Sequence, residues 1–301
     1  MITRAVFSYF NPDESFSNRA GFSNYSDFLF TMALATCLAR RHFKQVQVVS
    51  TAWGIKVLKQ AGIQATEYST ALDVLRDQQV SRWFWAYGKM IAYAQQTTPF
   101  VHIDNDVFLW KPLPDRVLQA ELCFQSKEFL DVPEYRWYNV LKPCWDAAPV
   151  KPQIVVDNEV TDFVYNCGVC GGWNLDFFKE WIQCSAQYIF APENQDLFFK
   201  QFKNILMHQN LYHEQYFAAS LIKAHNMRSR VEVITDDVKN LVVATDRGYT
   251  HLWGATKTTQ RNMQSVRVRL LREAPEVYDR VNSFVNNYLF NECPKDVRIT
   301  A

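Results

Sequence analysis

Strand-like and helix-like segments alternate through the first hundred residues, and this alternation constrains the fold more than any other feature. Short runs of β-branched and aromatic residues predict buried strands; they are Ala5–Tyr9, Val46–Ser50, Thr66–Tyr68 and Phe100–Ile103. Apolar residues with helical spacing lie between them, at Ser26–Arg40, Ala52–Ala61 and Ser81–Gln95. This order predicts an α/β fold with a mixed, mostly parallel sheet and helices on both faces.

The second half of the chain is less regular. The segment Asp162–Trp173 resembles a strand, and helical spacing recurs in three places, at Asp176–Tyr188, His213–Ala224 and Pro275–Leu289. Short strands are predicted at Val231–Ile234 and Leu241–Val243. Because no composition shift marks a linker, we expect one domain over residues 1–260, with 261–301 as a helical extension packed on it.

Charge and hydropathy exclude several classes of protein. The formal net charge is +1, whereas a nucleic-acid-binding protein carries a strong basic excess. The N-terminus lacks a basic segment followed by an apolar one, so no signal peptide is expected. The longest mostly apolar stretch, Phe28–Ala39, is too short for a transmembrane segment. We therefore expect a cytoplasmic protein. Arg267, Arg269 and Arg272 suggest peripheral contact with the inner membrane, with a solvated helix face as the alternative.

Seven scattered cysteines indicate reduced, mostly buried thiols. Two of them, Cys167 and Cys170, have motif spacing. A zinc site of this type needs a second pair, and a redox motif usually opens a helix rather than lying in a strand-like run. We interpret the spacing as coincidental, and a zinc or redox module stays open as an alternative.

Two carboxylates follow the predicted strand Phe100–Ile103, in the sequence Asp104-Asn105-Asp106. Ligands of such sheets bind at the carboxyl ends of strands. Two carboxylates at this spacing can share one hard cation, which in turn binds two phosphate oxygens of a nucleotide diphosphate. Apolar residues flank the motif on both sides, and buried charges are costly unless they are paired. These observations predict a cation site, with a solvated loop as the alternative.

A second motif, His251-x-x-Gly254-x-x-Lys257, lies near the C-terminal end of the main domain. The imidazole is a suitable third ligand for an ion such as Mn²⁺. Gly254 allows the backbone to approach a phosphate closely, and Lys257 supplies a point charge for the diphosphate. The alternative is a core histidine beside an ordinary turn.

Together these motifs resemble those of the glycogenin-like and lipopolysaccharide galactosyltransferase-like enzymes, which are glycosyltransferases of the GT-A type. The first motif resembles their Asp-x-Asp, and the second resembles their metal- and diphosphate-binding motif. Three more matches occur in the same order along the chain: Lys89 on the preceding helix, Asn166-Cys167-Gly168-Val169 as the Asn-x-Gly strand, and Glu214-Gln215 as the Asp-Gln pair. The stretch Phe100–Leu113 indicates a distinct bacterial subgroup.

The resemblance implies a GT-A, Rossmann-like fold that binds a nucleotide-sugar, and Mn²⁺ or Mg²⁺ held by Asp104, Asp106 and His251. The donor contacts that it implies are Lys89, Asp104, Asn105, Gly168, Gly254 and Lys257, and the catalytic candidates are Asn166, Glu214 and Gln215. It also implies transfer of a hexose, from a UDP-sugar, to a glycan, glycolipid or protein acceptor with retention of configuration. This role belongs to polysaccharide biosynthesis.

Two departures from the family pattern affect the site. Glu214 stands where the family has Asp, and Thr258 and Thr259 replace its proline and tryptophan. A purely structural role remains the alternative for each of these residues. Asn166 could lie in a turn, Glu214 and Gln215 could be first-turn helix residues, and Lys89 could be a solvated charge. Independently of the resemblance, Tyr9 ends the first strand, where such folds seat the base, and we expect its ring, or that of its neighbour Phe10, to stack on uracil.

Two other functions use similar residues. A metal-dependent nucleotidyltransferase or phosphohydrolase would also hold a cation with carboxylates, but it should show a glycine-rich loop after the first strand. The segment after Tyr9 contains one glycine, Gly21. A non-catalytic nucleotide-sugar-binding protein is the second alternative.

Overall fold

The predicted sheet is present in the computed structural model, which describes residues 1–132, 137–235 and 248–289. Seven strands form it in the order β3-β2-β1-β4-β7-β6-β8. Their bounds are β1 Arg4–Tyr9, β2 Gln45–Ser50, β3 Glu67–Ser69, β4 Phe100–Ile103, β6 Leu122–Phe129, β7 Phe163–Gly172 and β8 Val231–Val233. Strand β7 runs antiparallel to both of its neighbours, and the other pairings are parallel. The predicted fold class, α/β with a mixed and mostly parallel sheet, is therefore confirmed.

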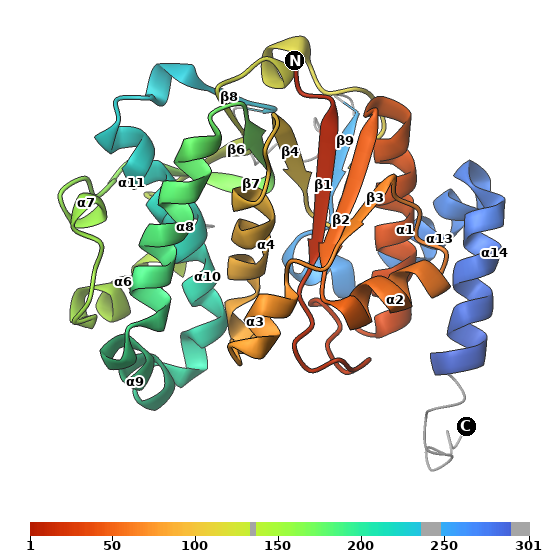
Figure 1. Ribbon diagram of the computed structural model, residues 1–301, viewed down its shortest axis with the longest axis horizontal. Coiled ribbons are helices and arrows are strands. Elements are labelled where there is room, and N and C mark those ends of the chain that lie inside the picture. The colour runs from red at the N-terminus through yellow and green to blue at the C-terminus, as the bar shows by residue number, and fades with distance from the viewer. Residues whose placement is uncertain (133–136, 236–247, 290–301) are drawn as a thin grey trace.

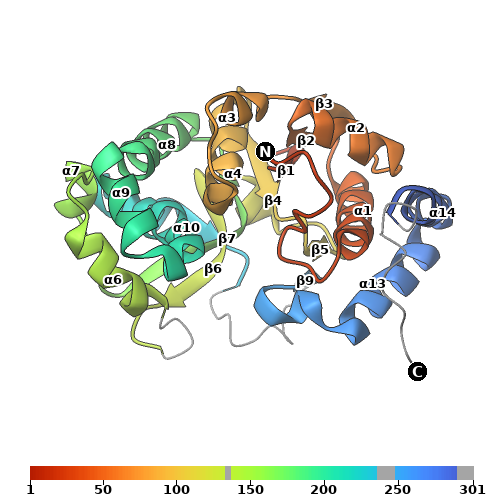
Figure 2. The same cartoon turned by 90° about the horizontal axis from the view of Figure 1, so that it is seen from below.

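Alternate side chains of each strand enter two different cores, one on each face of the sheet. In β1, Val6 packs into one core while Ala5 and Phe7 pack into the other. Helices α4 and α8 cover the first face, and α1 covers the second, with α13 packed against α1 (Figures 1 and 2). Because successive strand residues point to opposite faces, a strand buried on both sides has a continuous apolar run. This explains why β1, β2 and β4 are recognisable in the sequence.

The α-helices have the bounds α1 Tyr25–His42, α2 Ala52–Gln60, α3 Asp73–Asp77, α4 Trp85–Ala94, α5 Asp115–Leu118, α6 Trp137–Ala147, α7 Gln153–Val156, α8 Leu175–Phe190, α9 Pro192–Lys200, α10 Gln209–Leu211, α11 Phe217–Ala224, α13 Gln260–Glu273 and α14 Pro275–Phe284. Short 3₁₀ segments are Arg82–Phe84, Lys203–His208, Arg228–Arg230 and Gly254–Thr258. Two π-helical segments occur, at Tyr212–Tyr216 and Val285–Leu289.

Side-chain caps fix where two of the long helices begin. Asn24 precedes α1 and accepts a hydrogen bond from the backbone N–H of Asp27 at 2.8 Å. Asn174 does the same for Phe177 at the start of α8, at 3.2 Å. Each cap satisfies one of the N–H groups that a helix leaves unpaired in its first turn. The first residues of both helices are therefore determined by the local sequence.

Most predicted elements lie within one to three residues of their observed positions. Strand β6 was not predicted, because its second half, Gln125 to Glu128, is polar. Helices α6 and α9 were also not predicted. The predicted strand Leu241–Val243 lies outside the described residues.

The C-terminal helices pack on α1. Met263, Val266 and Leu270 of α13 are buried there, and Arg267 forms an ion pair with Asp27 at 2.8 Å. The guanidinium of Arg269 lies over the Trp110 ring. These contacts use part of the basic cluster for packing. The domain division at residue 260 and contact of this cluster with a membrane both remain predictions.

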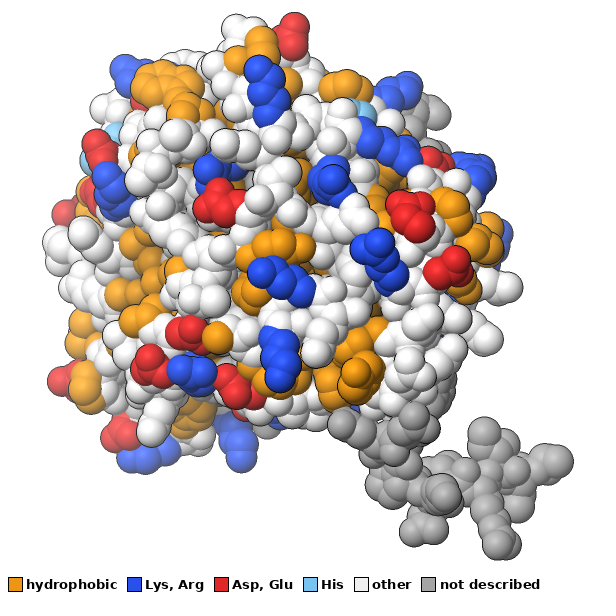
Figure 3. Space-filling model, turned by 45° about the vertical axis from the view of Figure 1, so that its right-hand side comes forward, with side chains coloured by type: hydrophobic (Ala, Val, Ile, Leu, Met, Phe, Trp, Pro, Cys, Tyr) orange, Lys and Arg blue, Asp and Glu red, His pale blue; other side chains and the backbone are white. Residues whose placement is uncertain are grey.

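The surface on this side carries lysine and arginine side chains interspersed with aspartate and glutamate (Figure 3). Such mixing agrees with the formal net charge of +1, and neither positive nor negative side chains dominate the face drawn in Figure 3. Among the described helices, none combines the length and the hydrophobicity that crossing a bilayer requires.

Candidate metal and donor site

The two predicted metal motifs meet at one edge of the sheet. Strand β4 ends at Ile103, and a tight turn, in which the N–H of Val107 donates to the carbonyl of Asp104 at 3.0 Å, leads into strand β5, Val107–Leu109. Strand β5 pairs with β9, Tyr249–His251, so that Val107 lies opposite His251. One ligand atom from each of Asp104, Asp106 and His251 then lies within 4.8 Å of the other two. The predicted convergence of the imidazole with both carboxylates is confirmed.

The orientation of His251 is set by Gln125. The Nδ1 atom of His251 lies 2.8 Å from the Gln125 Oε1 atom. Because this oxygen can only accept a hydrogen bond, Nδ1 carries a proton. The other ring nitrogen, Nε2, lies on the side of Asp106, at 3.3 Å from Oδ1, and its lone pair is the one that would bind a cation. Such an outer hydrogen bond is the usual way in which a protein orients a histidine ligand.

A bulge in β7 makes room for this pair. Phe124 pairs with Cys170 and Ser126 pairs with Asn166, so Gln125 lies opposite the three residues Cys167 to Val169. A Cβ atom on Gly168 would lie 2.1 Å from Gln125 Oε1 and 2.7 Å from His251 Cε1. Any side chain at position 168 would therefore displace the imidazole. Bulges commonly re-aim side chains beside active sites.

Lys257 pairs with the second carboxylate of the Asp-x-Asp motif. Its Nζ atom lies 2.7 Å from Asp106 Oδ2. The left-handed backbone of Gly254, with φ of +54°, begins the 3₁₀ turn that returns Lys257 to the site. Burial alone would raise the pKa of Asp106, but the charges of Lys257 and His251 outweigh it and hold that pKa below its ordinary value. Asp106 is therefore a carboxylate at neutral pH.

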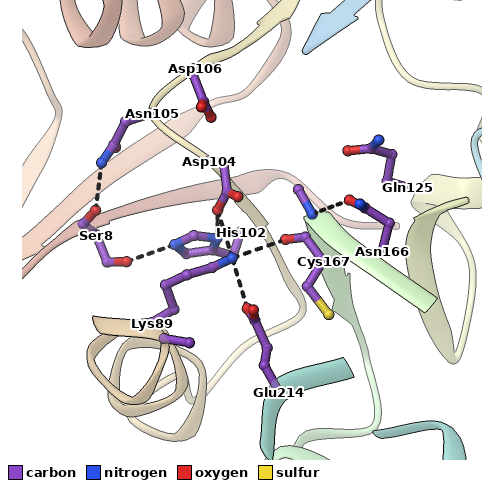
Figure 4. Close-up of polar contacts among 12 residues, drawn as sticks. Ser8, Lys89, His102, Asp104, Asn105, Asp106, Gln125, Asn166, Cys167 and Glu214 are labelled. Atoms are coloured by element: carbon purple, nitrogen blue, oxygen red, sulfur yellow. Dashed lines mark hydrogen bonds and ion pairs between the residues drawn. The ribbon is translucent and has the colours of Figure 1, made fainter. Parts of the chain in front are cut away.

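Lys89 on α4 joins the first carboxylate to the other half of the site. Its Nζ atom lies 2.8 Å from Asp104 Oδ1 and 2.7 Å from Glu214 Oε1, and it donates to the carbonyl of Cys167 at 3.3 Å (Figure 4). Burial would lower the pKa of Lys89, but the two carboxylates raise it above its ordinary value. Burial also raises the pKa of Glu214 to about 7, against the opposing effect of Lys89. The buried lysine is therefore a charged centre to which both carboxylates are fixed.

Glu214 and Gln215 reach the site from a π-helical turn, Tyr212–Tyr216, that precedes α11. All five residues of this turn are buried. Single π-turns inside helices often occur at functional sites. The hydroxyl of Tyr138 donates to Gln215 Oε1, and Asn166 Nδ2 donates to Glu128 Oε1 at 2.6 Å. Asn166 and Gln215 are therefore linked through Glu128 and Tyr138, and Glu214 joins the site through Lys89.

Family comparison gives one match, over residues 3–284, to a family model described as "Family of unknown function (DUF6734)". The chain belongs to the DUF6734 family. No curated protein sequence matches it.

Several solved structures resemble this DUF6734 protein. The glycosyltransferase GlyE of Streptococcus pneumoniae TIGR4 has a TM-score of 0.40 and 11% identity, covering 98% of this chain and 66% of that protein. The galactosyltransferase LgtC, in complex with donor and acceptor sugar analogs, has a TM-score of 0.43 and 12% identity, covering 92% of this chain and 95% of that protein. The inositol-1-phosphate CTP transferase of T. maritima has a TM-score of 0.35 and 10% identity, covering 95% of this chain and 97% of that protein. The DUF6734 chain spans just under two thirds of the pneumococcal protein.

Glycosyltransferases are thus among the structures that this DUF6734 protein resembles, as its motifs predicted. The set also includes a nucleotidyl-transferring enzyme. At these TM-scores the likeness does not separate the two reactions, so the assignment of a function depends on the site itself.

The expectation that Tyr9 stacks on a base is wrong. Its side chain is 3% exposed, its ring packs on Phe28 with centroids 4.4 Å apart, and its hydroxyl donates to the Asn18 carbonyl at 3.0 Å. The neighbouring Phe10 is also buried. An aromatic residue that ends a buried strand packs into the core as readily as it faces a ligand, and the sequence does not separate these two outcomes.

Asn105 anchors the turn that carries the Asp-x-Asp motif, and its predicted contact with a donor stays a prediction. Its amide donates to the Ser8 carbonyl at 2.8 Å, which ties the Asp-x-Asp turn to the end of β1. Ser8 also contacts His102 Nε2 at 2.9 Å. Burial and the charge of Lys89 hold the pKa of His102 well below its ordinary value, so this imidazole is neutral.

The alternative of a zinc or redox module at Cys167 and Cys170 gains no support. Both thiols are free and buried, and the β7 bulge turns both into the same apolar core. Within the described part of the chain, the one group of at least three potential metal ligands is Asp104, Asp106 and His251. Cys293 lies outside the described residues.

Proposed function

We propose that this protein is a metal-dependent glycosyltransferase that moves a hexose from a UDP-sugar to an acceptor hydroxyl with retention of configuration. The observation that carries the proposal is the convergence of Asp104, Asp106 and His251 at the carboxyl edge of the sheet, with a lysine beside each carboxylate. This arrangement combines a cation site with positive charge for a diphosphate.

The donor set suits a divalent cation such as Mn²⁺ or Mg²⁺. Two carboxylates and one imidazole are typical of ions that accept both oxygen and nitrogen ligands, and the Nε2 nitrogen of the imidazole faces Asp106. When bound, the cation would stabilise the negative charge that develops on the leaving phosphate.

The side chains around the cation site divide the remaining work. Lys257 is placed to bind the diphosphate, and Gly254, next to which a side chain would find open space, allows the backbone to approach it. Lys89, Asp104 and Glu214 form a rigid charged group that can hold the hexose hydroxyls. Asn166 and Gln215 complete the sugar pocket.

In a single-step transfer with retention, the acceptor hydroxyl attacks from the face that the leaving group occupies. A leaving phosphate oxygen then takes the acceptor proton. Glu214 is held by Lys89 and by the Tyr93 hydroxyl, which donates to it at 3.3 Å, so it is suited to orienting the sugar. The acceptor would be a glycan, glycolipid or protein, and the reaction would take place in the cytoplasm at or near the inner membrane.

The deciding experiment incubates the purified chain with Mn²⁺ and a panel of UDP-hexoses, with and without candidate acceptors. Release of UDP together with free or transferred hexose supports the proposal. Release of sugar phosphate would instead indicate the phosphohydrolase or nucleotidyltransferase alternative. Tight binding of the donor with no turnover across the panel would indicate a non-catalytic nucleotide-sugar-binding protein.

A further inference from the structure

Glu128 is a buried carboxylate that the functional motifs do not include. It lies on β6 with a 6% exposed side chain, and it forms no ion pair with the described lysines and arginines. Its partners are two neutral groups: Asn166 Nδ2 donates to Oε1 at 2.6 Å, and the Tyr138 hydroxyl lies 3.4 Å from Oε2. Burying an acid without a cationic partner is costly. A purely structural position would be filled at lower cost by an apolar residue.

The contacts of Glu128 fix the orientation of the Asn166 amide. The backbone N–H of Gly168 can only donate, so the Asn166 atom that faces it at 2.9 Å must be the oxygen. The amide nitrogen then faces Glu128. The amide is thus held at both ends, and its second N–H and the second lone pair of its oxygen remain for a ligand.

The same carboxylate acts on Gln215 through Tyr138. The Tyr138 hydroxyl lies between Glu128 Oε2 and Gln215 Oε1 and contacts both, and its single proton is donated to one of the two oxygens at a time. Tyr138 and Gln215 are 5% and 6% exposed, so water competes little for these contacts. The Gln215 amide is thereby held by a hydroxyl that Glu128 also contacts.

We propose that Glu128 is a positioning residue for the two amides of the sugar pocket. It holds Asn166 directly and Gln215 by way of Tyr138, so that both side chains are fixed in place before a sugar binds. This inference rests on the proposed function, because it assumes that Asn166 and Gln215 contact the donor sugar.

The test compares two ligands that share the diphosphate but differ in the sugar. Calorimetry with Mn²⁺ gives the Kd of UDP and of GDP, and of their glucose, galactose, N-acetylglucosamine and mannose conjugates. In Glu128→Gln we expect the Kd of the nucleoside diphosphate to stay within about twofold, since Lys257 and the cation site are untouched. The extra affinity that the best sugar conjugate has over its diphosphate should fall about tenfold, the order expected for one lost charge-assisted hydrogen bond.

Tyr138→Phe supplies the second variant and serves if Glu128→Gln fails to fold. It should lower the same affinity ratio, and the double variant should lose little more than the larger single loss, because the two groups act as one unit. Glu193→Gln, on the exposed surface of α9, is the matched control.

Three outcomes would overturn the inference. Equal weakening of diphosphate and sugar conjugate would show a merely structural role, and additive losses in the double variant would separate Glu128 from Tyr138. An unchanged ratio in both single variants would show that the network does not reach the sugar. If the wild-type chain binds neither UDP nor GDP with Mn²⁺, the proposed function fails as well, which distinguishes the two failures.

Discussion

Lys257 Nζ and Asp106 Oδ2 lie 2.7 Å apart although 151 positions separate the two residues in the chain. The lysine is therefore held beside the cation site by the fold and not by local sequence. Its charge lies where it can meet an anion that binds next to the cation.

Lys257→Ala should weaken the binding of UDP with Mn²⁺ by about 1–3 kcal/mol, the usual loss for a hydrogen bond to a charged group. Calorimetry with UDP measures this directly. Lys200→Ala is the matched control, since Lys200 pairs with Asp196 on the surface of α9. Equal affinities of the Lys257 variant and the wild type would remove this residue from the diphosphate site.

Asp106→Ala should abolish Mn²⁺-dependent donor binding, because it removes one of three ligands and leaves Lys257 as an unpaired charge. Donor affinity is measured with Mn²⁺ and again with an excess of EDTA. Asp176→Ala, at the exposed start of α8, should leave both values unchanged. Donor affinity that is retained in the Asp106 variant and is insensitive to EDTA contradicts the metal site.

Gln125→Leu should lower the affinity for Mn²⁺ by about 10–100-fold while leaving the fold intact, since it removes the acceptor that orients His251. The readout is the Kd of Mn²⁺, obtained by titration without a nucleotide. Gln153→Leu, at an exposed position of α7, tests for a general effect of the substitution. A Kd within twofold of the wild type would mean that Gln125 does not orient the ligand.

Glu214 should make stability depend on pH in the metal-free protein. Burial raises its pKa from the ordinary value of 4.5 to about 7, so the folded state binds a proton more tightly than the unfolded state. The stability gained from this proton is full below pH 4.5 and is lost as the pH rises through about 7. Denaturant unfolding between pH 4.5 and 8 should show a decline in the wild type, of at most about 3 kcal/mol. The decline should be smaller in Glu214→Gln, and parallel curves would show that this carboxyl does not titrate in that range.

Motif spacing predicted the residues that converge at the candidate metal site, since Asp104, Asp106, His251 and Lys257 occur in recognisable patterns. It did not find Gln125, Glu128 or Tyr138. Each of these is a single polar residue with no spacing of its own, and its role arises from the β7 bulge and from the position of α6. The strand that carries Gln125 and Glu128 was missed for the same reason, because the polar side chains that serve the site remove the apolar pattern of a buried strand.

For Tyr9 the sequence predicts the element but not the direction of the side chain. The end of β1 was located correctly, but which way its aromatic ring points depends on α1, which packs against it through Phe28. Local sequence specifies a strand and its end, whereas tertiary packing decides whether a ring at that end is available to a ligand.

The small β5–β9 ladder also joins two segments that lie far apart in the sequence. The Trp110 indole donates to Thr250 Oγ1 at 3.0 Å across this ladder, between residues 140 positions apart. A cation bound by Asp104, Asp106 and His251 would connect the two ends of this long stretch in the folded chain. Because these three ligands are separated in the unfolded chain, the cation would bind the folded state and stabilise it by mass action, so cation loading should raise Tm as well as enabling donor binding.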